Sequence, residues 1–116
     1  MGYADTEDNI LCVANAYTKS FYMGEPFRGL PKNVIDELKI MTVMYTEDVG
    51  GILILRFGED GELEYETRHE ENDFYYDEIV SVLKIKQLQR ERYELMEELE
   101  NYYRIVFLGE GLEDID

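Results

Sequence analysis

The clearest alternation of apolar and polar residues lies in the middle of the chain. Residues 51–57 and 62–68 are largely apolar at every second position, which is typical of strands, and a glycine-containing turn separates them. With Gly61 left-handed and forming a bulge, the apolar side chains of both strands share one face, whereas the competing register mixes apolar and acidic side chains. The bulged hairpin pairs Phe57 with Leu63, Leu55 with Tyr65, Leu53 with Thr67, Arg56 with Glu64 and Ile54 with Glu66.

Two strands and a helix are expected before this hairpin. Residues 10–17 and 21–23 are rich in β-favouring side chains, and the polar stretch 18–20 between them predicts a turn. Pro31 suits the first position of a helix, where its missing N–H costs nothing. Apolar residues at helical spacing extend this helix to about Lys39.

The segment from Ile40 to Thr46 has two interpretations. It could continue the preceding helix, but its β-branched and aromatic residues favour a strand. We therefore predict a strand here, followed by a turn over residues 47–50.

The last third of the chain predicts one long helix. Between Asn72 and Gly109 there is no glycine or proline, so we expect a helix over about residues 74–107. Asn72 or Asp73 would cap its start, and Gly109 would stop it. Residues 74–101 alone would span ~42 Å, which exceeds the ~35 Å width of a compact domain of this length.

The apolar stripe of this helix changes sides between Ser81 and Lys84. Either the helix breaks there and both parts face the chain's own core, or it is continuous and its second half faces another subunit. We favour the second interpretation. Arg92 interrupts the seam, where it either pairs with a carboxylate across a dimer interface or lays its aliphatic stem along the seam. The first-half stripe consists of Tyr76, Ile79, Val80 and Leu83, and the predicted dimer seam of Leu88, Arg92, Leu95, Leu99, Tyr102 and Val106.

Together these elements predict an α+β fold. Its antiparallel sheet has about five strands in the order ββαβββα, and helices cover a face. We expect a disordered N-terminus over residues 1–9, one domain over 10–108, and an acidic tail over 109–116. The element order resembles that of profilin-like folds, including roadblock, longin and PAS-type modules, a likeness without a motif that implies no function.

The chain is strongly acidic, with 27 acidic and 11 basic residues and a net charge of −16 over 116 residues. This charge argues against binding to nucleic acid or anionic membranes and favours a basic partner. Cys12 is the only cysteine, which excludes an internal disulfide and indicates a reducing compartment. No membrane-spanning stretch or signal peptide is visible, so the expected location is the cytoplasm.

Basic residues gather over residues 84–92, which hold four cations and one acid. One interpretation is a docking patch for an anionic partner. The alternative is neutralisation by carboxylates of the same chain or of a partner subunit. The candidate anion-docking residues are Lys84, Lys86, Arg90 and Arg92.

No group of residues predicts catalysis. His69 is the only histidine, and Cys12 lies in an apolar strand, where a buried and inert thiol is usual. There is no phosphate-binding glycine loop, nucleophile motif or metal-spaced ligand set. We therefore expect no enzyme activity, no metal and no cofactor.

Three stretches, residues 36–41, 46–53 and 83–91, carry a resemblance that covers most of the chain. They resemble a family of small acidic proteins from gut Firmicutes that is classed as a domain of unknown function. The resemblance implies a bacterial cytoplasmic protein and supplies no catalytic residues.

Three functions follow from these observations. The first is a non-enzymatic protein–protein interaction module that forms a homodimer through its C-terminal helix. The second is a small-ligand-binding or sensor domain with a pocket between sheet and helices. The third is an acidic inhibitor that mimics the charge of nucleic acid.

Overall fold

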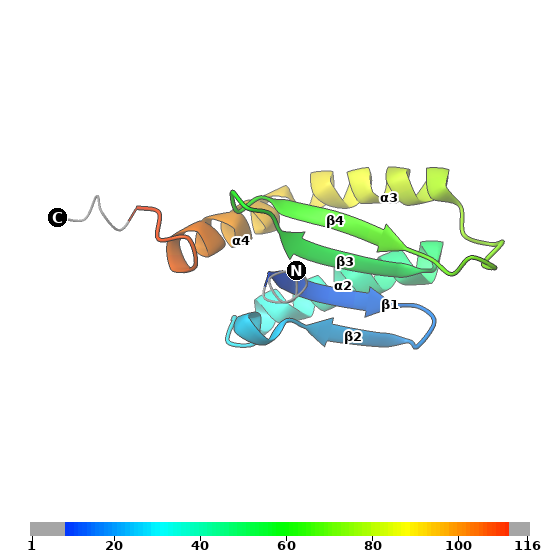
Figure 1. The fold of residues 1–116 in the computed structure, drawn as a ribbon, viewed down its shortest axis with the longest axis horizontal. Coiled ribbons are helices and arrows are strands. Elements are labelled where there is room, and N and C mark those ends of the chain that lie inside the picture. Colours follow the sequence, from blue (N-terminus) through cyan, green and yellow to red (C-terminus); the bar gives the residue numbers. More distant parts are fainter. Residues whose placement is uncertain (1–8, 112–116) are drawn as a thin grey trace.

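The computed structural model describes residues 9–111 of the chain. Within this range two antiparallel hairpins join side by side into a four-stranded sheet with the spatial order β2-β1-β3-β4 (Figure 1). The strands are β1 (Ile10–Asn15), β2 (Ser20–Met23), β3 (Ile52–Phe57) and β4 (Leu63–Arg68). The helices are the short 3-10 helix η1 (Glu25–Phe27), α2 (Lys32–Val49), α3 (Glu78–Glu91) and α4 (Tyr93–Val106).

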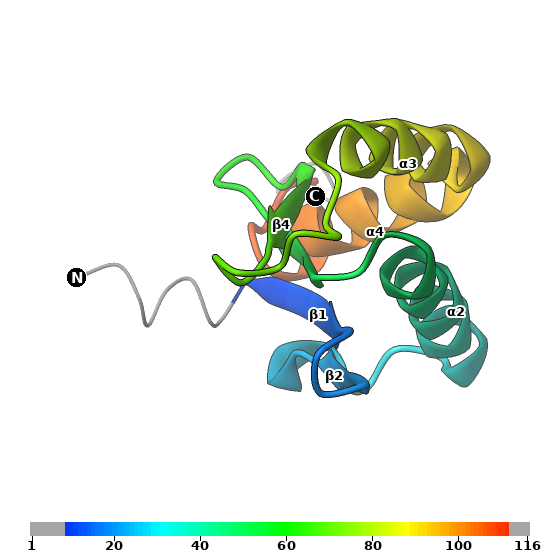
Figure 2. The ribbon, with the colours of Figure 1, turned by 90° about the vertical axis from the view of Figure 1, so that its right-hand side faces the viewer.

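The helices lie on one side of the sheet, which gives two layers in the edge-on view (Figure 2). The predicted α+β class is confirmed. The five-stranded sheet and the order ββαβββα are wrong, because the described chain runs through two strands, a helix, two strands and two helices. The profilin-like element order is therefore not observed. None of the helices in residues 9–111 is both long and apolar enough to cross a membrane.

The predicted fifth strand is absent from the described chain because residues 40–46 are helical. They belong to α2, which continues to Val49. Leu38, Met41, Thr42 and Tyr45 recur at helical spacing, and each is at most 2% exposed. The hydroxyl of Thr42 donates to the carbonyl oxygen of Leu38 at 2.8 Å, so this buried polar group is satisfied within the helix. Burial of one helical stripe therefore outweighs the β-propensity of the individual residues.

The β3–β4 hairpin has the predicted register at all five predicted pairs. Gly61 has a φ of 90°, the left-handed conformation that this turn requires. A Cβ at this position would lie 2.7 Å from Cγ of Arg104 in α4, so the turn also packs closely against the last helix.

The first hairpin turns earlier than predicted, because β1 ends at Asn15 instead of Tyr17. The side-chain oxygen of Asn15 accepts hydrogen bonds from the backbone N–H groups of Tyr17 at 2.9 Å and Thr18 at 3.2 Å. This local bonding diverts the backbone from the ladder into a turn.

The predicted long helix is two helices. Asp77, not Asn72 or Asp73, caps the first of them, and its side chain accepts from the N–H groups of Ile79 and Val80. The chain leaves helical geometry at Arg92, which has φ −112° and ψ 27°, and not between Ser81 and Lys84. At 14 residues each, α3 and α4 are ~21 Å long, which removes the length mismatch.

The core lies between the sheet and the helices. Met96 and Leu99 of α4 pack in this core. The ring of Tyr103 stacks on that of Phe57 in β3, with 4.1 Å between the ring centroids. Residues 1–8 and 112–116 lie outside the described part of the chain, and with them most of the predicted disordered N-terminus and acidic tail. The fully buried large side chains include Phe27, Phe57, Leu11, Leu38, Leu53 and Leu55.

Candidate functional site

Most apolar residues of the predicted dimer seam pack inside the chain. Leu99 is 3% exposed, and Leu88, Leu95 and Tyr102 are partly buried against the same core. A charge at Leu99 would therefore enter the core of the folded chain instead of a subunit interface. Leu99 is therefore closed to a partner, whereas Leu88, Leu95 and Tyr102 expose part of their surface.

The other two seam residues lie at the ends of α4. Arg92 pairs with Glu37 of α2 in the same chain, with Nη1 2.6 Å from Oε1. Val106 is 57% exposed at the end of α4. The predicted carboxylate partner of Arg92 is therefore found within the described chain.

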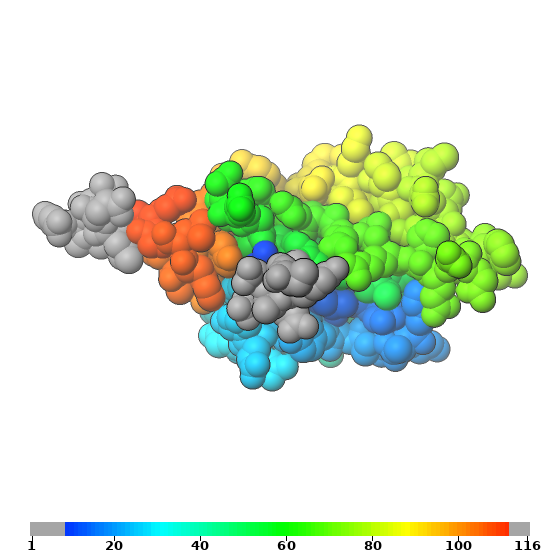
Figure 3. Space-filling model, in the orientation of Figure 1, coloured from blue at the N-terminus to red at the C-terminus, as the bar shows by residue number. Residues whose placement is uncertain are grey.

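Exposed apolar residues lie at the C-terminal end of the predicted helix, where residues 105–108 are 40–57% exposed, and along its first half, which we expected to face its own domain. That expectation is wrong, since Ile79 is 74% exposed, Leu83 61%, Val82 51% and Val80 39%. We call these four residues the α3 face. The loop before α3 adds Tyr75, which is 98% exposed, and together with the start of α3 it forms one end of the molecule (Figure 3).

The orientation of α3 follows from its polar contacts with α2. Ser81 is 3% exposed, and its hydroxyl lies 2.6 Å from that of Tyr45 and 2.9 Å from that of Tyr76. Lys84 pairs with Asp48 at 3.2 Å. Together with Ile85 and Leu88, which pack against the core, these contacts turn one side of α3 toward the domain. The α3 face lies on the other side and points outward.

The predicted anion-docking patch divides into two pairs. Lys84 and Arg92 are neutralised by carboxylates of α2, as described above. Lys86 and Arg90 are exposed and form no ion pair within residues 9–111. The sequence positions 79, 83, 86 and 90 are spaced by four, three and four, so these two cations lie on the same side of α3 as Ile79 and Leu83.

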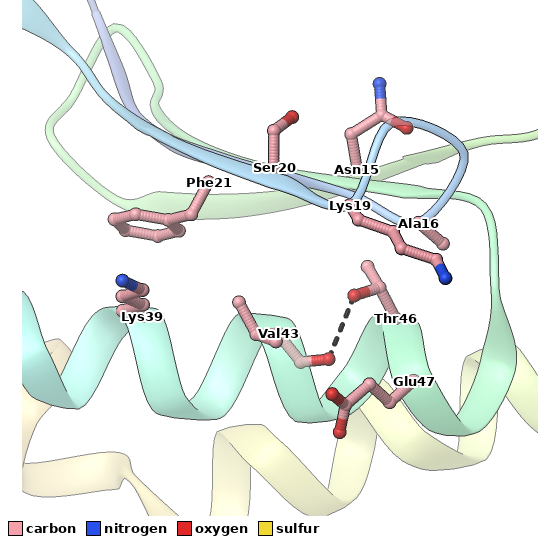
Figure 4. A pocket seen from close by; sticks show the side chains of 9 residues that line it. All are labelled: Asn15, Ala16, Lys19, Ser20, Phe21, Lys39, Val43, Thr46 and Glu47. Atoms are coloured by element: carbon pink, nitrogen blue, oxygen red, sulfur yellow. Dashed lines mark hydrogen bonds between the residues drawn. The ribbon is translucent and has the colours of Figure 1, made fainter.

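A groove of about 580 Å³ lies between the β1–β2 hairpin and α2 (Figure 4). Phe21 and Val43 form its apolar wall, and Lys19 and Lys39 enter it from the hairpin and from the helix. The hydroxyl of Thr46, also in the lining, donates to the carbonyl oxygen of Val43 at 2.9 Å. Asn15, Ala16, Ser20 and Glu47 complete the lining.

Cys12 lies buried in the sheet, and His69 lies beside the loop that precedes α3. Cys12 is fully buried in β1, and burial raises the pKa of its thiol, which keeps it protonated and unreactive. The ring of His69 stacks on Tyr76 at 4.4 Å, and its Nε2 lies 3.5 Å from a carboxylate oxygen of Glu78.

The sequence offered a pocket between sheet and helices as one alternative, but it indicated none of the residues that line the groove. Lys19 and Lys39 are 20 positions apart, and no local pattern indicates that a hairpin and a helix bring them together. The α3 face, in contrast, was visible as an apolar stripe, but its outward orientation depends on the contact between Tyr45 and Ser81.

The fold and these surfaces define a small two-layer α+β domain with an exposed apolar helix face and a groove beside a sheet edge. A family model matches residues 8–111, and the chain belongs to that family, a family of unknown function (DUF6145). No curated protein and no solved structure matches the chain.

Proposed function

We propose that this protein is a non-enzymatic interaction module that forms a homodimer through the α3 face. The observation that carries the proposal is the exposure of Ile79, Val82 and Leu83 on a helix whose N-terminal half is otherwise held by α2. Contiguous exposed apolar residues on a soluble domain mark interaction surfaces. Ile40 and Met44 of α2 are also exposed, at 51% and 55%.

The charges along α3 favour a second copy of the same helix as the partner. Its N-terminal end carries Glu78, whose side chain is 80% exposed, and its C-terminal half carries the exposed Lys86 and Arg90. Two antiparallel copies would place acids opposite bases at both ends and would also align their helix dipoles favourably.

The spacing supports a twofold axis near Leu83. At 1.5 Å per residue, Glu78 lies ~7.5 Å before Leu83, whereas Lys86 and Arg90 lie ~4.5 Å and ~10.5 Å after it. Glu78 of one copy would then lie between Lys86 and Arg90 of the other, within reach of their long side chains. The apolar residues would meet at the centre.

Light scattering of the full chain tests this proposal. We expect twice the mass of one chain for the wild type and the mass of one chain for Leu83→Glu. Ile105→Glu is the control, because Ile105 is 49% exposed on α4, outside the α3 face, and this variant should remain dimeric. A monomeric wild type, or an unchanged mass for Leu83→Glu, would contradict the proposal.

We also propose a bacterial, cytoplasmic setting and, beyond the second copy, a basic protein partner. The buried thiol, the net charge of −16 and the resemblance to small acidic proteins from gut Firmicutes support this setting. Recovery of the chain from a membrane or secreted fraction would argue against it.

A further inference from the structure

The groove lies beside β2, an edge strand of the described sheet, and on α2 away from α3. Its volume of about 580 Å³ falls within the ~300–1,000 Å³ range of small-molecule sites. It shares no lining residue with the α3 face, so a ligand bound in the groove would leave the proposed dimer surface free.

Two cations enter this groove without a carboxylate partner in the described part of the chain. Five of the eleven lysines and arginines form ion pairs within residues 9–111, and Lys19 and Lys39 are among the six that do not. Both therefore offer free ammonium groups at the groove. In Figure 4, Lys39 lies beneath the ring of Phe21, and Lys19 extends from the hairpin toward α2 beside Thr46.

The backbone at Lys19 adds a second observation. This lysine has a φ of 53°, a left-handed conformation that glycine or asparagine adopts at lower cost. The hairpin turn therefore carries a long cationic side chain at a position where local geometry favours a different residue. Strained positions of this kind occur preferentially at binding sites.

We propose that the groove binds a small organic monoanion with an apolar body. The apolar body would contact Phe21 and Val43, and the anionic group, such as a carboxylate, would accept a hydrogen bond from the ammonium group at one end of the groove, that of Lys19 or that of Lys39. Glu47 in the same lining opposes ligands with several negative charges, such as nucleoside triphosphates.

Titration calorimetry with three matched probes tests the charge requirement. The probes 4-phenylbutyrate, 4-phenylbutanol and 4-phenylbutylamine share one apolar body and carry a negative, a neutral and a positive group. We expect the full chain to bind phenylbutyrate with an affinity about tenfold higher than that of the alcohol, because a charge-assisted hydrogen bond is lost with the alcohol. The amine should not bind measurably.

Variants locate the site. Replacing both Lys19 and Lys39 by alanine should weaken phenylbutyrate binding about tenfold or more, whereas Lys32→Ala, at an exposed lysine paired with Asp36, should leave it unchanged. Val43→Trp should abolish binding of both phenylbutyrate and the alcohol by filling the groove.

Circular dichroism and light scattering monitor the fold and the dimer in every variant. Loss of binding with an unchanged mass separates this site from the α3 face. Absence of saturable phenylbutyrate binding at millimolar concentration, or equal binding by the double lysine variant, would overturn the proposal.

Discussion

The hydroxyl of Tyr45 lies 2.6 Å from that of Ser81, and this hydrogen bond joins the buried side of α2 to α3. Tyr76 completes the cluster, with its hydroxyl 2.9 Å from Ser81 and 3.3 Å from Tyr45. The three hydroxyls satisfy one another where water has little access. Their position determines which side of α3 faces the domain, and therefore that Ile79 and Leu83 face outward.

Replacing Ser81 by alanine should lower the free energy of unfolding by about 1–2 kcal/mol, because the buried Tyr45 hydroxyl loses its shortest hydrogen bond. Urea unfolding measures the change. Thr18→Ala is the matched control, since Thr18 shares an exposed hydrogen bond with Ser20, and it should cost less than about 0.5 kcal/mol. Equal effects of the two substitutions would show that the cluster does not anchor α3.

Tyr65→Phe should leave the protein as stable as the wild type at pH 7, or stabilise it by up to about 1 kcal/mol. The reason is that the buried Tyr65 hydroxyl has no hydrogen-bond partner in the described chain. Thermal unfolding would detect the difference. A loss of more than about 1 kcal/mol would mean that the hydroxyl is satisfied after all.

The same hydroxyl predicts a pH dependence. Burial, aided by the charge of Glu100, raises the pKa of Tyr65 in the folded state. Folding therefore favours the protonated form, so this contribution to stability is full below the unfolded pKa of ~10 and is lost as the pH rises above it. Tyr65→Phe should reduce the alkaline loss of stability, whereas Tyr75→Phe, at a 98% exposed position, should not.

The ion pair between Arg92 and Glu37 should contribute more than an exposed pair. The two side chains are 30% and 44% exposed, compared with 88% and 50% for Lys32 and Asp36. A double-mutant cycle with alanine at both positions should give a coupling energy of about 1 kcal/mol for the first pair and about 0.3–0.5 kcal/mol for the second. Equal coupling energies would contradict a special role for Arg92 at the junction of α3 and α4.

Gly61→Ala should destabilise the domain by about 1–2 kcal/mol, because its φ of 90° is unfavourable for a residue with a Cβ. Gly29→Ala is the control, since a Cβ there meets no atom of the structure within 4 Å and its φ lies outside the left-handed region. Chemical denaturation of both variants tests the difference. A cost at Gly61 no larger than at Gly29 would mean that the turn can adopt another geometry.

The sequence predicted the parts of the fold that depend on local alternation. The register of the β3–β4 hairpin follows from matching apolar residues across Gly61, and the structure has that register. The strand predicted over residues 40–46 is wrong, because burial of a helical stripe from Leu38 to Tyr45 outweighs the β-propensity of the single residues. The choice between strand and helix for this segment depends on the apolar spacing in the helical turns before and after it, and not on the segment alone.

Other features have no local signal. Neither glycine nor proline marks the break at Arg92, which coincides with an ion pair to Glu37 in another helix. The sequence predicts an apolar stripe that changes sides, but Ile79 and Leu83 of the first half are exposed, whereas Leu99 of the second half is buried. The choice between the halves depends on tertiary contacts of Ser81 and Leu99, which sequence periodicity does not encode.

The most direct test of the α3-mediated dimer is a charge-reversal exchange measured by native mass spectrometry. One variant carries Glu78→Lys, and the other carries Lys86→Glu with Arg90→Glu. Each variant alone should be mainly monomeric, because like charges would meet at both ends of the antiparallel pair. Mixed in equal amounts, the two should form a heterodimer with opposite charges restored at both ends. Dimers of each variant alone, or monomers after mixing, would contradict the account.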